Sequence, residues 1–348
     1  MPVARLTLSR AQVLAFRRRV GALDARLPAR AGSLRRAAWA GLQDSMPRAA
    51  LLSIHARVGN VRASSWEAPG LVQIWGPRYS TYVVAASDLA VFTLGRMPEA
   101  GPLRRRAEDL AARLHARLDG GRLAEGEAAR AIGERPNAIR YATLTGRIAI
   151  RWDGARAPTI WTLPPPEVAP RAACLELARR YLHAFGPTTP DAFTRWAGIG
   201  EAAGVAAFEA LRRGLTPVRT PLGDAWILSR DEAAIRAAPA PTAPARLLPS
   251  GDAYYLLQGA DRALLVPKVA QRAALWTSRV WPGAVLVDGE IVGTWRRSAG
   301  QVTVTPWQRL ARTAREAIEV EAATLPLPDL RGAVVVRWDA MDATAGSA

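Results

Sequence analysis

Three consecutive polar residues, Gln43, Asp44 and Ser45, separate two apolar segments with helical spacing. Pro47 follows closely, and proline suits the first turn of a helix because its missing N–H group would have no partner there; we therefore expect a helix over residues 47–58. An amide, a carboxylate and a hydroxyl held at a helix-to-helix corner could orient a water molecule and take up its proton. The same pattern is typical of a helix N-cap, in which Asp44 or Ser45 accepts hydrogen bonds from backbone N–H groups. The residues alone leave both interpretations open.

The other residues that could do chemistry lack the spacing of a known site. His55, His115 and His183 lie far apart, so a metal centre is not expected and each histidine is interpreted as a helix-face residue. Cys174 lies on an apolar helical face and is interpreted as a core residue. No glycine-rich phosphate loop follows any predicted strand. We expect neither a metal nor another cofactor.

The composition favours a soluble protein that binds a polyanion. The 348 residues carry a formal net charge of +17, and Lys268 is the only lysine. Such an excess of arginine favours nucleic acid as the partner, although a G·C-rich genome also produces an arginine-rich protein that binds no DNA. No apolar run approaches the roughly 20 residues of a membrane helix. A secretory signal is also missing, and one cysteine cannot form an intrachain disulfide. We expect a cytoplasmic, nucleoid-associated protein.

The order of three helices and then a β-hairpin is predicted three times, which is the pattern of a winged helix. The expected winged-helix units are residues 1–98, 99–166 and 167–240. A first helix is capped by Ser9, and the other predicted helices cover residues 33–42, 47–58, 103–118, 123–132, 136–144, 172–185, 190–197 and 201–211. The predicted hairpins cover 71–84, 147–163 and 217–228. Units of this kind most often lie along DNA.

A Pro/Ala-rich linker at 239–244 leads to a β-rich domain over residues 245–340. Its predicted strands are 254–257, 263–266, 284–287, 291–297, 302–305 and 332–336, with one helix from 307 to about 324. The chain is therefore expected to have an α+β fold, with three tandem winged-helix units followed by a C-terminal β-rich domain.

Four segments resemble the tandem winged-helix DNA glycosylases of the AlkZ/YcaQ-like family, which act on alkylated purines and interstrand crosslinks. They are residues 41–52, 74–82, 247–254 and 287–296, and together they span nearly the whole chain. The resemblance implies a C-shaped, basic channel that grips duplex DNA, with the β-domain behind it. It implies a monomeric DNA repair enzyme whose substrate is duplex DNA carrying an alkylated purine, with no membrane partner.

The resemblance also assigns site residues. The family typically presents Gln-x-Gln or Gln-x-Asp where this chain has Gln43, Asp44 and Ser45, so these three are the implied catalytic residues and Ser45 replaces the second polar group. The family commonly presents Arg-Gly-Thr-x-His where this chain reads Arg78-Tyr-Ser-Thr-Tyr82, with Tyr82 in place of the histidine. The predicted DNA-contacting residues are Arg48, His55, Arg57, Trp75, Arg78, Tyr79 and Tyr82.

Two functions follow as hypotheses. In the first, the protein is a monofunctional glycosylase that hydrolyses the N-glycosidic bond of alkylated or bulky-adduct purines. An N-alkylated purine already carries positive charge and leaves without a general acid, so the enzyme needs only to hold water and stabilise the sugar cation. In the second, the protein is a catalytically silent DNA-binding protein, a damage sensor or regulator, which the Ser45 and Tyr82 departures favour.

Overall fold

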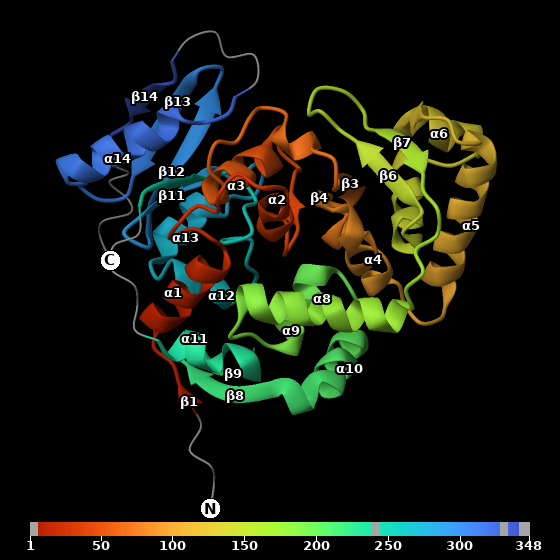
Figure 1. Ribbon diagram of the computed structural model, residues 1–348, viewed down its shortest axis with the longest axis horizontal. Coiled ribbons are helices and arrows are strands. Elements are labelled where there is room, and N and C mark those ends of the chain that lie inside the picture. Colours follow the sequence, from red (N-terminus) through yellow and green to blue (C-terminus); the bar gives the residue numbers. More distant parts are fainter. Residues whose placement is uncertain (1–5, 238–243, 328–332, 341–348) are drawn as a thin grey trace, which may run out of the picture.

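The computed structural model describes residues 6–237, 244–327 and 333–340. Helices and short strands alternate through the first two thirds of the chain, and a five-stranded sheet dominates the rest. Figure 1 shows the second helical unit at one side, the C-terminal sheet at the other, and the first unit between them. The predicted α+β class is confirmed. No helix in the described ranges is long and apolar enough to cross a membrane.

The first unit contains the polar corner, and its elements differ in detail from the prediction. They are α1 (Arg10–Val20), α2 (Ala31–Ala37), β2 (Leu42–Gln43), α3 (Ala49–Arg57), β3 (Leu71–Trp75), β4 (Thr81–Ala85) and α4 (Leu89–Phe92). Ser9 caps α1 as expected, in a capping box with Gln12. The helix expected over 47–58 begins at Ala49, because Arg48 has a left-handed φ of 68° that a helix cannot contain. The second helix ends at Ala37, so a strand and not a helix leads into the corner.

The hairpins of the first two units join into one sheet. The second unit contains α5 (Pro102–Leu118), β5 (Leu123–Ala124), α6 (Glu125–Ala131), α7 (Pro136–Ile139), β6 (Ile148–Arg151) and β7 (Thr159–Thr162). Gln73 of β3 pairs with Ile150 of β6, and the strand order is β2-β4-β3-β6-β7-β5. Trp75 of β3 packs with Leu110 and Leu114 of α5. The sheet and this shared core hold the second unit against the first.

The third unit includes the start of the chain. It contains α8 (Pro170–Phe185), α9 (Pro190–Ala197), α10 (Glu201–Leu211), β8 (Leu215–Thr220), β9 (Gly223–Leu228) and α11 (Glu232–Arg236). β1 (Leu6–Thr7) runs parallel to β8, and Phe16 of α1 packs with Val218 and Ile227. In space, β1 and α1 therefore lie against the third unit, whereas the boundaries at residues 98 and 166 remain predictions.

The C-terminal domain is a five-stranded sheet with a helix against it. It contains β10 (Arg246–Leu248), α12 (Asp261–Leu265), α13 (Val269–Leu275), β11 (Gly283–Val287), β12 (Glu290–Ser298), β13 (Gln301–Pro306), α14 (Arg312–Ala323) and β14 (Val335–Trp338). Ile318 and Ala322 of α14 pack on Val285 and Val302 of the sheet. The strands predicted at 284–287, 291–297 and 302–305 correspond to β11, β12 and β13.

Other predictions for this domain were wrong. Residues 254–257 form a turn, because the Asp252 carboxylate accepts a hydrogen bond from the backbone N–H of Tyr254 and folds the chain back. The segment 263–266 lies mainly in α12, since a short apolar run fits a buried helix as well as a strand. The long helix starts at Arg312. The last strand begins at Val335, while Gly332 and most of the 239–244 linker lie outside the described residues.

A buried ion pair connects the first unit to the C-terminal domain. The Arg57 guanidinium at the end of α3 donates to both carboxylate oxygens of Asp252, at 2.6 and 2.7 Å. The hydroxyl of Ser53 donates to the same carboxylate at 2.7 Å. The Arg57 and Asp252 side chains are 4% and 0% exposed. With every oxygen satisfied, the pair fixes the turn after β10 against α3.

We predict that Arg57→Ala lowers the free energy of unfolding by about 3–5 kcal/mol, because it leaves the Asp252 carboxylate buried and uncompensated. Urea titration followed by tryptophan fluorescence would measure the loss. Arg104→Ala is the matched control, since Arg104 pairs with Glu108 on the exposed face of α5. That change should cost less than about 1 kcal/mol. Equal costs for the two variants would contradict the structural role given to the buried pair.

Candidate active site

The polar corner is held rigidly by main-chain contacts. Gln43 pairs with Tyr82 across β2 and β4, and the N–H of Asp44 donates to the carbonyl of Thr81 at 2.7 Å. Gly41 precedes β2 with φ 75°, and a Cβ there would meet the Phe92 ring at 2.9 Å. Only glycine fits both requirements. The chain therefore enters the corner in one conformation.

Asp44 serves as the cap, which answers one question that the sequence left open. Its side chain is 2% exposed, and one oxygen accepts from the N–H of Ala50 at 2.9 Å. The other oxygen accepts from Nε2 of Gln73 at 2.7 Å. Both oxygens are thus occupied by protein donors, which favours a positioning role for Asp44 at the corner, and its part in catalysis stays a prediction.

Gln73 extends this network to the second unit. While Nε2 donates to Asp44, Oε1 accepts from the N–H of Trp152 at 2.6 Å, and Nε2 also lies 3.2 Å from the Trp152 carbonyl. Arg48 reaches the same loop, where Nη1 donates to the carbonyl of Asp153 at 2.9 Å. The loop between β6 and β7 is therefore attached to the corner by Arg48, just before α3, and by Gln73 of β3.

Gln43 and Ser45 lie on the other side of the chain from Asp44. The Gln43 amide nitrogen donates to Oγ of Ser45 at 3.1 Å, and Ser45 is exposed. The amide oxygen of Gln43 is buried and has no hydrogen-bond partner among the described residues. A Cβ placed on Gly251, whose φ is 75°, would lie 3.2 Å from that oxygen. Gln43 thus keeps one unused acceptor at the junction with the C-terminal domain.

Cations surround the corner. Arg151 and Arg48 both lie over the ring of Trp66, at 4.1 and 5.2 Å from its centroid, and Arg151 forms an ion pair with Glu67. Desolvation, followed by the positive charge of Arg48, lowers the pKa of Arg297 on β12. This links Arg297 electrostatically to Arg48, although the two come from different domains. The corner therefore carries the positive charge of Arg48 and Arg151, and Arg297 adds to this field from the C-terminal domain.

Four of the predicted DNA-contacting residues are structural instead. His55, Arg57, Trp75 and Tyr82 are 4%, 3%, 1% and 0% exposed. Arg57 is held by Asp252, Trp75 fills the core shared by the first two units, and Tyr82 lies among core residues with its pKa raised to about 12 by burial. Their burial argues against direct contact with DNA, and the assignment of DNA contacts stays a prediction.

His55 lies at the junction of α3 and α14. Its Nε2 is 3.0 Å from the hydroxyl of Thr324, and Arg26 donates to its carbonyl and to the carboxylate of Glu321. Burial, with the charges of Arg26 and Arg246, lowers the pKa of His55 to about 3. The neutral imidazole is therefore a packing element between α3 and α14. No group of three potential metal ligands occurs among the described residues.

Arg78 and Tyr79 point toward the third unit and the second unit, respectively. Both have left-handed φ angles, of 55° and 57°, in the turn between β3 and β4. Gly198 at the end of α9 closely approaches the backbone of Arg78. The Tyr79 ring meets Tyr141 edge-on at 5.0 Å. Of the predicted contact residues, Tyr82 and Arg48 lie at the corner with Gln43, and of these two only Arg48 is not fully buried.

Sequence reasoning missed Gln73, Arg151, Gly251 and Arg297. Gly251 lies within the third family-like segment, which was a usable signal, but its partner in space was not evident. Gln73 and Arg151 look like ordinary strand residues in the sequence. They come to lie at the corner only because β3 pairs with β6, and no local sequence pattern predicts that pairing.

The buried Asp44 predicts a distinctive pH dependence of stability. Burial raises its pKa to about 7 in the folded protein, against the opposing hydrogen bonds from Ala50 and Gln73. Between about pH 4 and pH 7 the folded protein therefore retains a proton that the unfolded chain releases, and stability falls as pH rises through this window. Denaturant titrations at several pH values would measure this fall.

The control is Asp44→Asn, which cannot titrate. Because the lowered pKa of His55 acts in the opposite direction, the informative quantity is the difference between wild type and variant. This difference should change steadily from pH 4 to 7 and level off above. A difference independent of pH would contradict the assignment.

Comparisons with known proteins agree with this arrangement. A model of the DNA glycosylase AlkZ-like family matches residues 34–326. The interstrand DNA cross-link repair glycosylase of Streptomyces sahachiroi is 33% identical over 166 residues, which are 46% of this chain and 42% of that protein. The match thus spans less than half of that relative. The solved structure of Streptomyces sahachiroi DNA glycosylase AlkZ has a TM-score of 0.77, with 20% identity over 96% of this chain and 100% of that chain, and shows a common fold.

The match to the family model extends from α2 to the end of α14 and includes the Gln43 corner, the Gly251 turn and the sheet that carries Arg297. The resemblance inferred from four short segments is therefore confirmed, and the chain belongs to the AlkZ-like DNA glycosylase family.

Proposed function

We propose that this protein is a monofunctional DNA glycosylase that hydrolyses the N-glycosidic bond of alkylated or bulky-adduct purines in duplex DNA. It acts as a monomer on nucleoid DNA and needs no cofactor. The observation that carries the proposal is the unpaired amide oxygen of Gln43, held at a rigid corner and bordered by Arg48 and Arg297. Membership of the AlkZ-like family supports the reaction class.

The chemistry asked of the corner is modest. An alkylated purine departs as a stable base, which leaves positive charge on the sugar, so no general acid is required. Gln43 accepts a hydrogen bond from a water molecule through its free oxygen, while its nitrogen is fixed by Ser45. The water oxygen bonds to the sugar carbon and its proton passes to solvent. Asp44 acts indirectly, since it holds the strand that carries Gln43.

The substrate approaches from the side of the corner where Ser45 is exposed. Arg48, Arg151 and Arg297 bind backbone phosphates beside the lesion, since none of them has a buried carboxylate as its partner in the described structure. Arginines close to one another repel, and a phosphate between them relieves that repulsion. This arrangement favours DNA over an uncharged substrate.

We expect Gln43→Ala to lower the rate of base excision about 100-fold or more while DNA affinity changes little, because only the positioning of water is lost. Single-turnover excision of N7-methylguanine from a duplex, read as alkali-labile sites, measures the rate. Arg104→Ala is the control, because Arg104 is an exposed arginine on α5 outside the corner, and this variant should retain activity. If wild type releases no base at any enzyme concentration, the proposed reaction is wrong.

Ser45→Gln provides a gain-of-function test. Ser45 donates and accepts through one short hydroxyl, whereas a glutamine there offers a longer amide beside Gln43 and restores the family pattern. We expect the variant to excise at least as fast as wild type, because the position is exposed and tolerates a larger side chain. Slower excision by a folded variant would show that the serine has a specific role of its own.

A catalytically silent DNA-binding protein is the second candidate, favoured by the uncharged Ser45 and the core position of Tyr82. Both candidates require a salt-dependent DNA affinity. Replacing Arg48 or Arg297 by Ala should reduce the slope of log K against log salt by about 1 each, as expected for one lost phosphate contact. Fluorescence anisotropy with undamaged duplex measures the slope. The silent candidate is selected if binding is intact and wild type excises nothing.

A further inference from the structure

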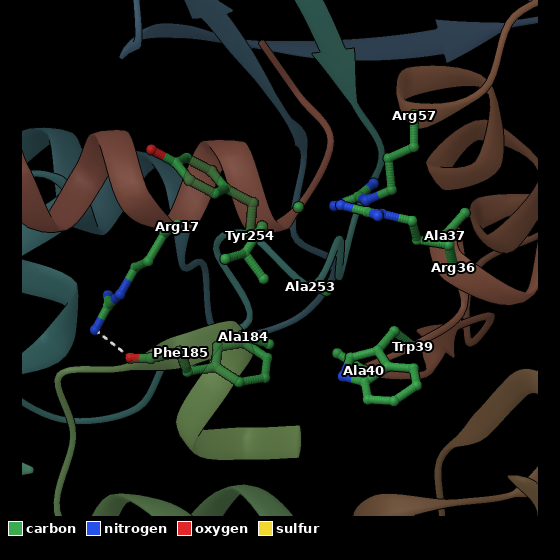
Figure 2. A pocket seen from close by; sticks show the side chains of 12 residues that line it. Arg17, Arg36, Ala37, Trp39, Ala40, Arg57, Ala184, Phe185, Ala253 and Tyr254 are labelled. Atoms are coloured by element: carbon green, nitrogen blue, oxygen red, sulfur yellow. Dashed lines mark hydrogen bonds between the residues drawn. The ribbon is translucent and has the colours of Figure 1, made fainter. Parts of the chain in front are cut away.

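A separate small cavity lies where the C-terminal ends of three helices meet. It measures about 40 Å³, room for about three water molecules. Its walls come from the last turns of α1, α2 and α8 and from the turn after β10 (Figure 2). The residues that line the cavity do not include Gln43. The lining residues are Arg17, Val20, Gly21, Arg36, Ala37, Trp39, Ala40, Arg57, Ala184, Phe185, Ala253 and Tyr254.

No aspartate or glutamate lines this cavity. The indole Nε1 of Trp39 is buried and has no hydrogen-bond partner among the described residues. Figure 2 shows the guanidinium of Arg17 turned away from Trp39, toward the carbonyl of Phe185. A buried donor without an acceptor is costly, so the Trp39 N–H indicates that an acceptor belongs beside it.

Arg36 adds a charge that nothing in the described structure balances. Its exposed side chain extends from α2 toward the cavity in Figure 2. No described residue makes a hydrogen bond or an ion pair with its guanidinium. The neighbouring Arg35 differs, since it pairs with Asp88 at 3.0 Å. Arg36 is therefore free to bind an anion.

The helix ends do not cancel this charge. Helix C-termini carry negative partial charge, but Arg17 donates to the carbonyls of Phe185 and Gly186 at the end of α8. Arg180 lies near the carbonyl of Trp39 after α2, at 3.4 Å. Arg57 is balanced by Asp252. With these groups matched to one another, Arg36 and the Trp39 N–H remain for a ligand.

The cavity opens toward solvent through a wider groove. The groove has a volume of about 430 Å³ and is lined by Val20, Gly32, Arg35, Arg36, Trp39 and His183. Val20, Arg36 and Trp39 line both spaces. A ligand can therefore place one small anionic group in the inner cavity while the rest of it occupies the groove.

We propose that this cavity is a phosphate-binding site, in which Arg36 and the indole N–H of Trp39 hold the oxygens. A phosphate presents several acceptor oxygens, which matches a guanidinium and an N–H that lie together at the end of α2. The occupant is inorganic phosphate or the phosphate of a nucleotide or of DNA. Neither Gly251 nor Gln43 lines the cavity, so it is distinct from the proposed active site.

The test is calorimetric titration of the full-length protein with inorganic phosphate, in a phosphate-free buffer at constant ionic strength. Wild type should bind one phosphate per chain, and Arg36→Ala should weaken binding at least about tenfold. Arg30→Ala is the matched control, because Arg30 is an exposed arginine at the opposite end of α2. No binding to wild type, or equal weakening by both changes, overturns the proposal.

Trp39→Phe separates the site from a purely structural role. It removes the unpaired N–H and keeps an aromatic ring, so without phosphate the thermal midpoint should stay the same or rise. Phosphate affinity should fall several-fold in the same variant. A lower midpoint with unchanged phosphate affinity would overturn the proposal.

Competition between inorganic phosphate and a second ligand identifies the source of the phosphate. If duplex DNA displaces phosphate from wild type, the site binds the DNA backbone; if a nucleoside monophosphate displaces it and DNA does not, the site binds a small ligand. Binding is the readout throughout, and a failure of base excision would leave these results unaffected.

Discussion

The hydrogen-bonded carboxyl group of Asp44 is the interaction on which the rest of the site depends. One oxygen anchors the first turn of α3 and the other anchors Gln73, so a single buried group joins a helix, a strand and, through Gln73, the loop of the second unit. Because neighbouring side chains of an extended segment point to opposite sides, burying Asp44 turns Gln43 and Ser45 outward. The orientation of Gln43 and Ser45 thus follows from the hydrogen bonds that hold Asp44 in the interior.

Gln43 also depends on contacts with the turn after β10 in the C-terminal domain. Gly251 packs against its amide because the next residue, Asp252, is fixed by Arg57 and Ser53. These three polar side chains form a closed buried set with no unmet donor or acceptor, which a low-dielectric interior requires. The free oxygen of Gln43 differs from them because it is the group left available for a ligand. Gly251, which packs against the amide of Gln43, is thus the direct chain neighbour of Asp252, which belongs to the buried polar set.

The sequence predicted the architecture better than the site. Composition and the repeated order of helices and hairpins indicated an α+β DNA-binding protein, and short segments such as residues 41–52 identified the family. Helix ends were less accurate, since the left-handed Arg48 has no sequence signature. Arg57 and Trp75 have residue types common at DNA interfaces, yet their tertiary partners bury them. Gln73 gained its role only through strand pairing between units, a contact over a long sequence separation.

The single sheet shared by the first two units has a mechanical consequence. Backbone pairing between β3 and β6, with Trp75 in the common core, leaves no flexible joint at which the second unit could swing over bound DNA. The loop between β6 and β7, attached at Arg48, is part of that same solid body. Under the proposed function, a rigid body of this kind leaves the DNA to adapt its shape to the protein. A damaged duplex, softer where its stacking is weakened, then bends at lower cost than an intact one.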